Sequence, residues 1–481
     1  MARLVVVSNR VAVPKSGTRA GGLEVAVHAA LKLNPGVWFG WSGRMAAKLE
    51  TRTIEHDDTS YVLTDLHRED YNEYYNGFAN SVLWPILHYR LDLAEFSRRD
   101  LSGYMRVNEH FAAELQKILR PDDIIWAHDY HLFPLAKALR ERGFKNKIGF
   151  FLHTPFPPPE IITALPHHER IVTALCQYDL VGFQTEIDSA NFCRYLETEC
   201  NFHRNGDGYA TGDRVVRVGA FPVGIETEPF KRLAHHAIRS PFVEGVLASL
   251  SGRAMIIGVD RLDYSKGING RMEAYERFLE HHPEWHNNVS YLQITPKSRS
   301  TIHEYAEMER QVNETVGRIN GNFAEAAWTP IRYVNRAHRR TALAGLYRAS
   351  RAALVTPLRD GMNLVAKEYV AAQNEEDPGV LILSRFAGAA VECKPALLVN
   401  PFDADSVGDA IYRALSMPLE ERRARHKALY EIIAANDISA WPKRFLDTLD
   451  GKGKPGAGGR EPEGRSSGVS AIQRAAGAKR G

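Results

Sequence analysis

Short runs of apolar, β-branched residues recur along the chain between stretches with helical periodicity. Five runs occupy 4–7, 124–127, 148–152, 180–183 and 215–220, and a second series occupies 254–259, 289–294, 352–355, 380–383 and 396–399. Continuously apolar runs are typical of strands that are buried on both faces of a parallel sheet. The stretches between them, such as 110–119 and 270–283, are long enough for crossover helices. The pattern therefore predicts an α/β protein.

A segment without strand signal, 225–245, separates the two series of runs. With 481 residues, the chain is too long for a single hydrophobic core. We therefore expect two facing, doubly wound, Rossmann-like domains, 1–235 and 236–450, with the last helices free to cross back to the first domain. The remainder, 451–481, is rich in Gly and poor in apolar residues, so we expect a disordered basic tail.

Composition narrows the classes of function. The chain is 44% apolar and 25% charged, as soluble globular proteins are. Its formal charge is +3, and the tail alone holds seven Lys or Arg against two Glu, so the body is not polybasic. We therefore expect no binding to nucleic acid or membranes. Four cysteines without CxxC or zinc spacing, and no apolar stretch near the roughly 20 residues of a membrane span, predict a cytoplasmic protein without a metal site.

Polar and charged residues follow six of the predicted strands at the point where each strand ends. These segments are 8–10, 128–131, 153–154, 260–267, 295–299 and 356–361. One Arg or His at a strand end is more often a solvated loop residue. In doubly wound sheets, however, ligands bind beyond the carboxyl ends of the strands. Six such ends together favour one ligand-binding cleft between the domains.

The residue types at these ends suit a phosphorylated ligand that carries hydroxyl groups. Four cations are suited to phosphate oxygens: Arg10, Arg261, Lys266 and Arg299. A helix that starts near 362–363 would offer backbone N–H groups to the same anion. Asp360 and Glu368 are acceptors suited to the hydroxyls of a sugar and a ribose. The set describes a sugar nucleotide and leaves open a second phosphorylated molecule.

Ten segments resemble, in order, the motifs of a known enzyme family. They are VVVSNR, AGGLEVAV, WFGWSG, YYNGFANSVLWP, WAHDYHL, FLHTPFPPPE, FPVGIE, GVDRLDYSKGI, TPLRDGMNLVAKEYVAAQ and SRFAGAA, and they run from about residue 3 to about residue 445. These motifs resemble those of the trehalose-6-phosphate synthases, the retaining glycosyltransferases of family 20. The resemblance implies the GT-B fold, with an acceptor-binding N-terminal domain and a nucleotide-sugar-binding C-terminal domain. It also implies transfer of glucose from UDP-glucose to glucose 6-phosphate, without a metal or other cofactor, as the first step of trehalose biosynthesis.

The resemblance also implies roles for individual residues. In the donor site, the diphosphate would be contacted or adjoined by Arg261, Lys266 and the backbones of Gly22, Leu364 and Val365. The ribose would be contacted by Glu368. The glucose would be contacted by His153, Asp360 and the backbones of Gly361, Met362 and Asn363. In the acceptor site, Arg10 and Arg299 would hold the phosphate, and Tyr75, Trp84 and Asp129 the sugar. The catalytic set would be Arg261, Lys266, His153 and Asp360.

Two alternatives remain beside this interpretation. One is another GT-B sugar-nucleotide transferase or an epimerase, although an epimerase should lack the acceptor clamp of Arg10 and Arg299. The other is a noncatalytic sugar-phosphate sensor, which should have lost some of the four cations. Cys393 stands where the family commonly has Leu, which leaves the preference for UDP over ADP or GDP open. The sequence also leaves the oligomeric state open, including a homo-oligomer, and assigns no contact to Arg359 or Lys367, which would then be solvated or structural.

Overall fold

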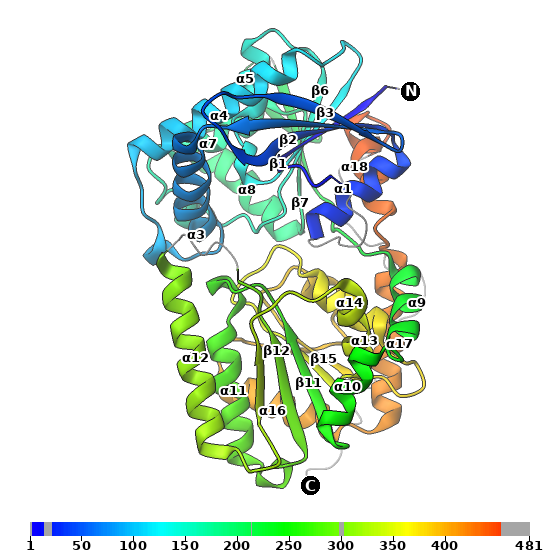
Figure 1. Cartoon of the computed structure of the whole chain (residues 1–481). Coiled ribbons are helices and arrows are strands. Elements are labelled where there is room, and N and C mark those ends of the chain that lie inside the picture. Colours follow the sequence, from blue (N-terminus) through cyan, green and yellow to red (C-terminus); the bar gives the residue numbers. More distant parts are fainter. Residues whose placement is uncertain (1, 14–21, 213, 298–302, 454–481) are drawn as a thin grey trace.

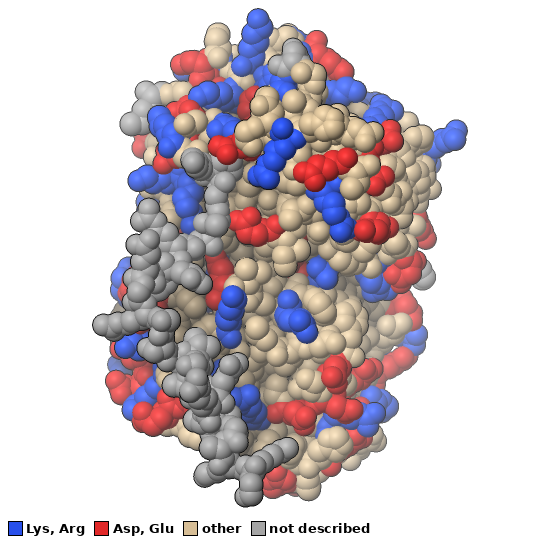
Figure 2. Space-filling model, turned by 180° about the vertical axis from the view of Figure 1, so that it is seen from behind, with Lys and Arg blue, Asp and Glu red and all other residues tan. Residues whose placement is uncertain are grey.

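A computed structural model describes residues 2–13, 22–212, 214–297 and 303–453. It contains two sheets, each surrounded by helices, and Figure 1 shows them as two lobes, one above the other. Arg299 and most of the predicted tail, 454–481, lie outside the described residues. In the described part, no helix is both long and apolar enough to cross a bilayer. On the face in Figure 2, basic and acidic side chains are interspersed.

The first sheet has ten strands in the order β3-β4-β2-β1-β5-β6-β7-β10-β9-β8. Their bounds are β1 (Leu4–Arg10), β2 (Gly36–Met45), β3 (Thr51–His56), β4 (Thr59–Leu66), β5 (Ile124–His128), β6 (Lys147–Phe151), β7 (Leu180–Phe183), β8 (Arg204–Asn205), β9 (Gly208–Thr211) and β10 (Arg214–Ala220). The central strands are parallel, and antiparallel pairs occur only toward the two edges of this described sheet, at β3–β4 and at β10–β9–β8. The apolar runs predict β1, β5, β6, β7 and β10, whereas β2, β3, β4, β8 and β9 were not predicted.

The second sheet has six parallel strands in the order β13-β12-β11-β14-β15-β16. Their bounds are β11 (Ala254–Val259), β12 (Val289–Ile294), β13 (Ile331–Val334), β14 (Ala352–Val355), β15 (Val380–Ser384) and β16 (Leu397–Val399). Five of the six match predicted runs, and β13 was missed. This is the doubly wound order, in which the direction of winding reverses between β11 and β14. The predicted α/β, GT-B class is confirmed.

Helices cover the faces of both sheets (Figure 1). In the first half they are α1 (Gly22–Leu33), α2 (Arg68–Asp70), α3 (Trp84–Leu87), α4 (Arg98–Gln116), α5 (Leu135–Glu141), α6 (Pro159–Ile162), α7 (His168–Val172) and α8 (Glu186–Glu199). In the second half they are α9 (Thr227–Ala237), α10 (Pro241–Leu250), α11 (Ile268–His281), α12 (His303–Phe323), α13 (Arg340–Ala349), α14 (Leu364–Ala372), α15 (Ala389–Glu392), α16 (Ala404–Ser416), α17 (Leu419–Ala435) and α18 (Ala440–Leu449). A π-helical segment, Tyr71–Leu83, precedes α3. The predicted helices 110–119 and 270–283 correspond to α4, which begins earlier, and to α11.

The last helix, α18, lies against the first sheet rather than the second (Figure 1). Its side chains Trp441 and Phe445 are completely buried in the core of the first domain, beside Trp126 of β5. A Cβ atom at Gly149 of β6 would lie 2.6 Å from the Phe445 ring, so the small residue makes room for that ring. The end of the chain thus ties the two lobes together.

The chain passes between the lobes in two segments, 221–226 and 436–440, that lie side by side. The backbone N–H of Ile438 donates to the Ile225 carbonyl oxygen at 3.0 Å, and a Cβ atom at Gly224 would lie 1.9 Å from the Asn436 oxygen. The expected domain boundary at 235 falls inside α9, whose buried Phe230 packs in the core of the second domain. We therefore propose a boundary near residue 225.

Candidate active site

The carboxyl ends of strands from both sheets meet at the boundary between the lobes. Arg10 ends β1, Asp129 follows β5 and His153 follows β6, and these three strands are neighbours in the first sheet. Arg261 follows β11 and Asp360 follows β14, on either side of the point where the second sheet reverses its winding. The fold thus brings five of the predicted residues to the strand ends that doubly wound sheets use for ligands.

The loop between β14 and α14 packs closely against the first lobe. A Cβ atom at Gly361 would lie 2.0 Å from the His153 carbonyl oxygen, and one at Gly388 would lie 1.8 Å from the Gly361 oxygen. Any side chain at either position would collide with backbone, so both glycines are required by close packing. The loop therefore lies directly against the strand end that carries His153.

Asp360 lies at the centre of a polar group. Lys266 Nζ is 2.5 Å from Asp360 Oδ2, and Asn363 Nδ2 donates to the same oxygen at 3.0 Å. Asn363 adopts left-handed backbone (φ +78°), and its Oδ1 accepts from the Ala366 N–H to cap α14. A buried Met362 anchors the turn in the core. The N-terminus of α14 therefore lies beside the Lys266 ammonium group.

The turn that carries Lys266 is fixed by buried charges that the sequence did not single out. Asp263 Oδ1 accepts from the N–H and the hydroxyl of Ser265, and so caps the turn. Arg271 is completely buried, and it pairs with Asp260 at 2.7 Å and donates to the Lys266 carbonyl oxygen at 3.0 Å. Burial raises the pKa of the Asp260 carboxyl, and the Arg271 guanidinium opposes that rise. Arg271 Nε also donates to Thr356 Oγ1 at 2.9 Å, so this side chain links the ends of β11 and β14 to the turn.

Arg261, by contrast, is exposed and faces the first domain. Its guanidinium carbon lies 5.9 Å from the centre of the Trp84 ring, and Trp84 Nε1 donates to Asp263 Oδ1 at 3.4 Å. The predicted donor cation Arg261 and the predicted acceptor residue Trp84 are therefore in contact across the lobe boundary.

His153 is half-buried between aromatic rings and the lobe boundary. Its backbone N–H donates to Asp129 Oδ1 at 3.3 Å, and its Nε2 lies 3.2 Å from His128 Nδ1. Removal from water lowers the pKa of His153 to about 3, so the imidazole is neutral near pH 7. In this state it can donate one hydrogen bond and accept another, but it carries no charge.

Glu368 lies one turn into α14. Burial raises the pKa of its carboxyl to about 7, and the Arg340 guanidinium, whose Nε lies 3.8 Å from Oε1, opposes that rise. Leu364 and Val365 occupy the first turn of the helix, and Leu364 packs against the cores of both lobes. The first turn of α14 is thus part of the contact between the lobes.

Four of the five predicted acceptor residues lie on the first domain. Arg10 is exposed, with its guanidinium carbon 5.8 Å from the centre of the Trp41 ring. Tyr75, from the π-helical segment, stacks on Tyr71 and on His131, with ring centres 5.3 and 5.8 Å apart. Asp129 holds a positive φ of 76°, an uncommon conformation that often occurs at functional sites. Gly22 begins α1, and Arg299 lies outside the described residues.

Arg359 and Lys367 have structural contacts. The Arg359 guanidinium carbon lies 3.8 Å from the centre of the Tyr89 ring, across the lobe boundary. Lys367 is completely buried, and its Nζ donates to the Val223 carbonyl oxygen at 2.8 Å and lies 2.7 Å from Glu392 Oε2. Of the two interpretations left open by the sequence, the structural one is right for Lys367, and solvation is not its environment.

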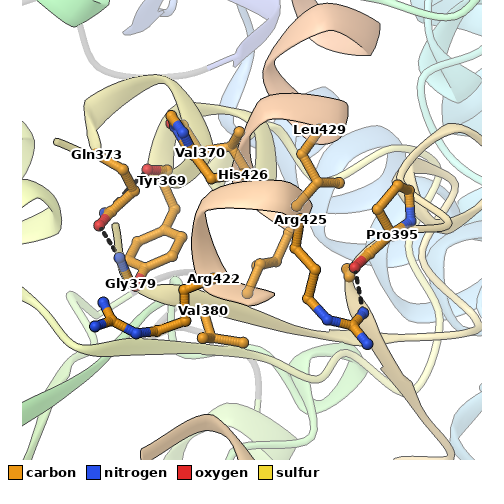
Figure 3. A pocket seen from close by; sticks show the side chains of 12 residues that line it. Tyr369, Val370, Gln373, Gly379, Val380, Pro395, Arg422, Arg425, His426 and Leu429 are labelled. Atoms are coloured by element: carbon orange, nitrogen blue, oxygen red, sulfur yellow. Dashed lines mark hydrogen bonds between the residues drawn. The ribbon is translucent and has the colours of Figure 1, made fainter. Parts of the chain in front are cut away.

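The pocket in Figure 3 is a different feature, between α14, α17 and β15. Its polar groups bond to neighbouring protein atoms: Arg425 donates to the Pro395 carbonyl oxygen, and Gln373 accepts from the Gly379 N–H. Residues predicted for the site do not line it. Across the described ranges, no three His, Cys, Asp or Glu side chains are grouped so as to hold a metal ion. Metal independence stays a prediction.

Comparison with known proteins gives one consistent result. The model of glycosyltransferase family 20 matches residues 5–451. A trehalose-6-phosphate synthase from Sinorhizobium fredii is 50% identical over 456 residues, covering 93% of this chain and 98% of the relative.

Two solved structures are also similar to this chain. An α,α-trehalose-phosphate synthase (UDP-forming) from Burkholderia xenovorans, in complex with glucose-6-phosphate, has a TM-score of 0.91 at 46% identity and covers 93% of this chain and 100% of that one. The E. coli protein bound with UDP-2-fluoro glucose has a TM-score of 0.89 at 45% identity, with coverage of 93% and 99%. Because the family model matches this chain over nearly the whole length of the chain, the chain belongs to glycosyltransferase family 20.

Proposed function

We propose that this protein transfers glucose from UDP-glucose to glucose 6-phosphate with retention, and releases UDP and α,α-trehalose 6-phosphate, the first step of trehalose biosynthesis. The observation that carries the proposal is the arrangement of Lys266 and a helix N-terminus around Asp360, at the lobe boundary and opposite His153. The names and ligands of the similar proteins support the same reaction.

Most of the donor half of the site lies on the second domain, and Gly22 and His153 of the first domain complete it. Arg261 and Lys266 hold the diphosphate together with the backbone of Leu364 and Val365 at the start of α14. Loss of UDP places extra negative charge on that diphosphate, and fixed cations beside it stabilise the transition state. Glu368 accepts from the ribose. Asp360, released in part from Lys266, accepts from glucose hydroxyls.

Most of the acceptor half lies on the first domain, and only Arg299 belongs to the sequence of the second domain. Arg10 and Arg299 bind the phosphate of glucose 6-phosphate, and Tyr75, Trp84 and Asp129 contact its sugar. The acceptor hydroxyl attacks the anomeric carbon from the face that UDP leaves. The bond from that carbon to the diphosphate oxygen breaks as the new glycosidic bond forms, and the acceptor proton passes to the departing diphosphate. Two flanking carboxylates, as in retaining glycosidases, are not used.

The test is UDP formation from UDP-glucose, with the sugar product identified by NMR. UDP should form only when glucose 6-phosphate is present, together with α,α-linked trehalose 6-phosphate. Equal UDP formation without acceptor would favour a hydrolase, and conversion of UDP-glucose to another UDP-sugar without release of UDP would favour an epimerase. No turnover with intact binding of both ligands would favour a sensor. In Arg10→Ala, the KM for glucose 6-phosphate should rise at least tenfold, while affinity for UDP-glucose stays unchanged.

A further inference from the structure

His128, the last residue of β5, supports His153 from behind. Its side chain is completely buried, with ring centres 4.6 Å from Trp126 and 5.9 Å from Trp441 of α18. Its Nδ1 lies 3.2 Å from His153 Nε2. Only one proton can lie between these two nitrogens, so the bond links the tautomers of the two rings.

The surroundings of Nε2, the other ring nitrogen of His128, determine which ring carries that proton. Its Nε2 is buried, and among the described residues it has no hydrogen-bond partner. The indole N–H groups of Trp126 and Trp441 are buried in the same way, and an indole can only donate. A proton on Nε2 would add a third unpaired buried donor to the two indole N–H groups of the neighbouring rings, and orphaned buried N–H groups are rarer than orphaned acceptors. The proton therefore belongs on His128 Nδ1, which donates to His153 Nε2.

We propose that His128 is a positioning residue that fixes His153 as the Nδ1–H tautomer and so makes His153 a hydrogen-bond donor to an oxygen of the donor glucose. With its Nε2 accepting from His128, the only ring proton of neutral His153 is on Nδ1, and that nitrogen has no partner among the described residues. A neutral donor can orient a sugar hydroxyl without adding positive charge beside an oxocarbenium-like sugar. The inference rests on the proposed function, since it requires the donor glucose to lie against His153.

The direct test is 15N NMR of the histidine rings in the full-length protein, with the His153 signals assigned by their loss in His153→Asn. We expect Nδ1 of His153 to be protonated and Nε2 to be unprotonated. Protonation of Nε2 instead would overturn the proposal. The measurement of the tautomer requires no catalysis, so it can support or contradict the role of His128 independently of the proposed transfer reaction.

Variants of His128 connect the tautomer to turnover. His128→Asn keeps an N–H donor near the position of Nδ1 and should retain both the Nδ1–H tautomer and most of kcat. His128→Phe removes the donor, so His153 should become a mixture of tautomers and kcat should fall about tenfold, the typical effect of one lost hydrogen bond. His286→Phe, a ring substitution in the second domain, should change neither the tautomer of His153 nor kcat. If folded His128→Phe keeps both the tautomer and kcat, His128 has no positioning role.

Discussion

The Lys266–Asp360 pair is the most important contact in the proposed donor site. Lys266→Ala should lower kcat by two orders of magnitude or more, because one charge-assisted contact to the leaving group is worth about 3 kcal/mol. Steady-state UDP release measures the effect. Lys231→Ala is the matched control, since it removes a half-buried lysine that also pairs with a carboxylate, Glu375 at 3.1 Å, and it should leave kcat unchanged. Near-normal turnover of folded Lys266→Ala would remove Lys266 from the leaving-group role.

Glu368 predicts a pH dependence of donor binding. Its pKa of about 7 lies above the ordinary value, so its contribution to stability is present in full below that ordinary pKa and is lost as the pH rises through about 7. The affinity for the donor should change with pH in the opposite direction, because the ionised carboxylate is the better acceptor for ribose hydroxyls. Calorimetry should show the affinity for UDP-glucose falling from about pH 8 to about pH 6. In Glu368→Gln, affinity should be lower and nearly independent of pH, and an unchanged dependence would exclude Glu368 as its source.

At the scale of elements, apolar runs were sufficient to predict ten strands but not the rest. The missed strand β2 is interrupted by Gly40, Ser42 and Gly43, and β3 is mostly exposed, so neither forms a continuous apolar run. In β13, Arg332 interrupts the run in the same way. Strand pairing in the sheet, which propensity does not report, holds these segments extended.

The predictable part of the site was the set of residues at strand ends. Arg261, Lys266 and Asp360 could be proposed because they lie in the polar segments that follow apolar runs. Arg271 carries no comparable signal, because it sits inside a helix. His128 lies in one of the strand-end segments, but its contact with His153 could not be predicted from that position. Their roles depend on contacts between distant segments, which a single sequence does not show.

Helix α18 should contribute strongly to the stability of the first domain. Phe445→Ala should lower the free energy of unfolding by about 3–5 kcal/mol, because the ring is fully buried against Gly149 and Trp126. Chemical denaturation measures the change. Phe402→Ala, whose side chain is 69% exposed, should cost about 0.5 kcal/mol or less. Equal effects of the two substitutions would contradict the placement of α18.

At the scale of the whole molecule, the two crossing segments control how the lobes are joined. Gly224→Ala should lower the unfolding temperature and alter the small-angle scattering profile, because its Cβ atom would collide with the Asn436 oxygen and force the segments apart. Gly245→Ala, with open space around the added methyl group in α10, should stabilise by about 0.5–1 kcal/mol. A Gly224→Ala protein with unchanged stability and scattering would show that the segments separate without cost.

A crystal structure with UDP and glucose 6-phosphate bound together tests the central claim most directly, because it probes both halves of the site at once. We expect the diphosphate to lie between Arg261, Lys266 and the first turn of α14, and the ribose to lie at Glu368. The acceptor phosphate should lie at Arg10 on the opposite lobe. A diphosphate bound away from Lys266, or both ligands bound on one lobe, would contradict this expectation.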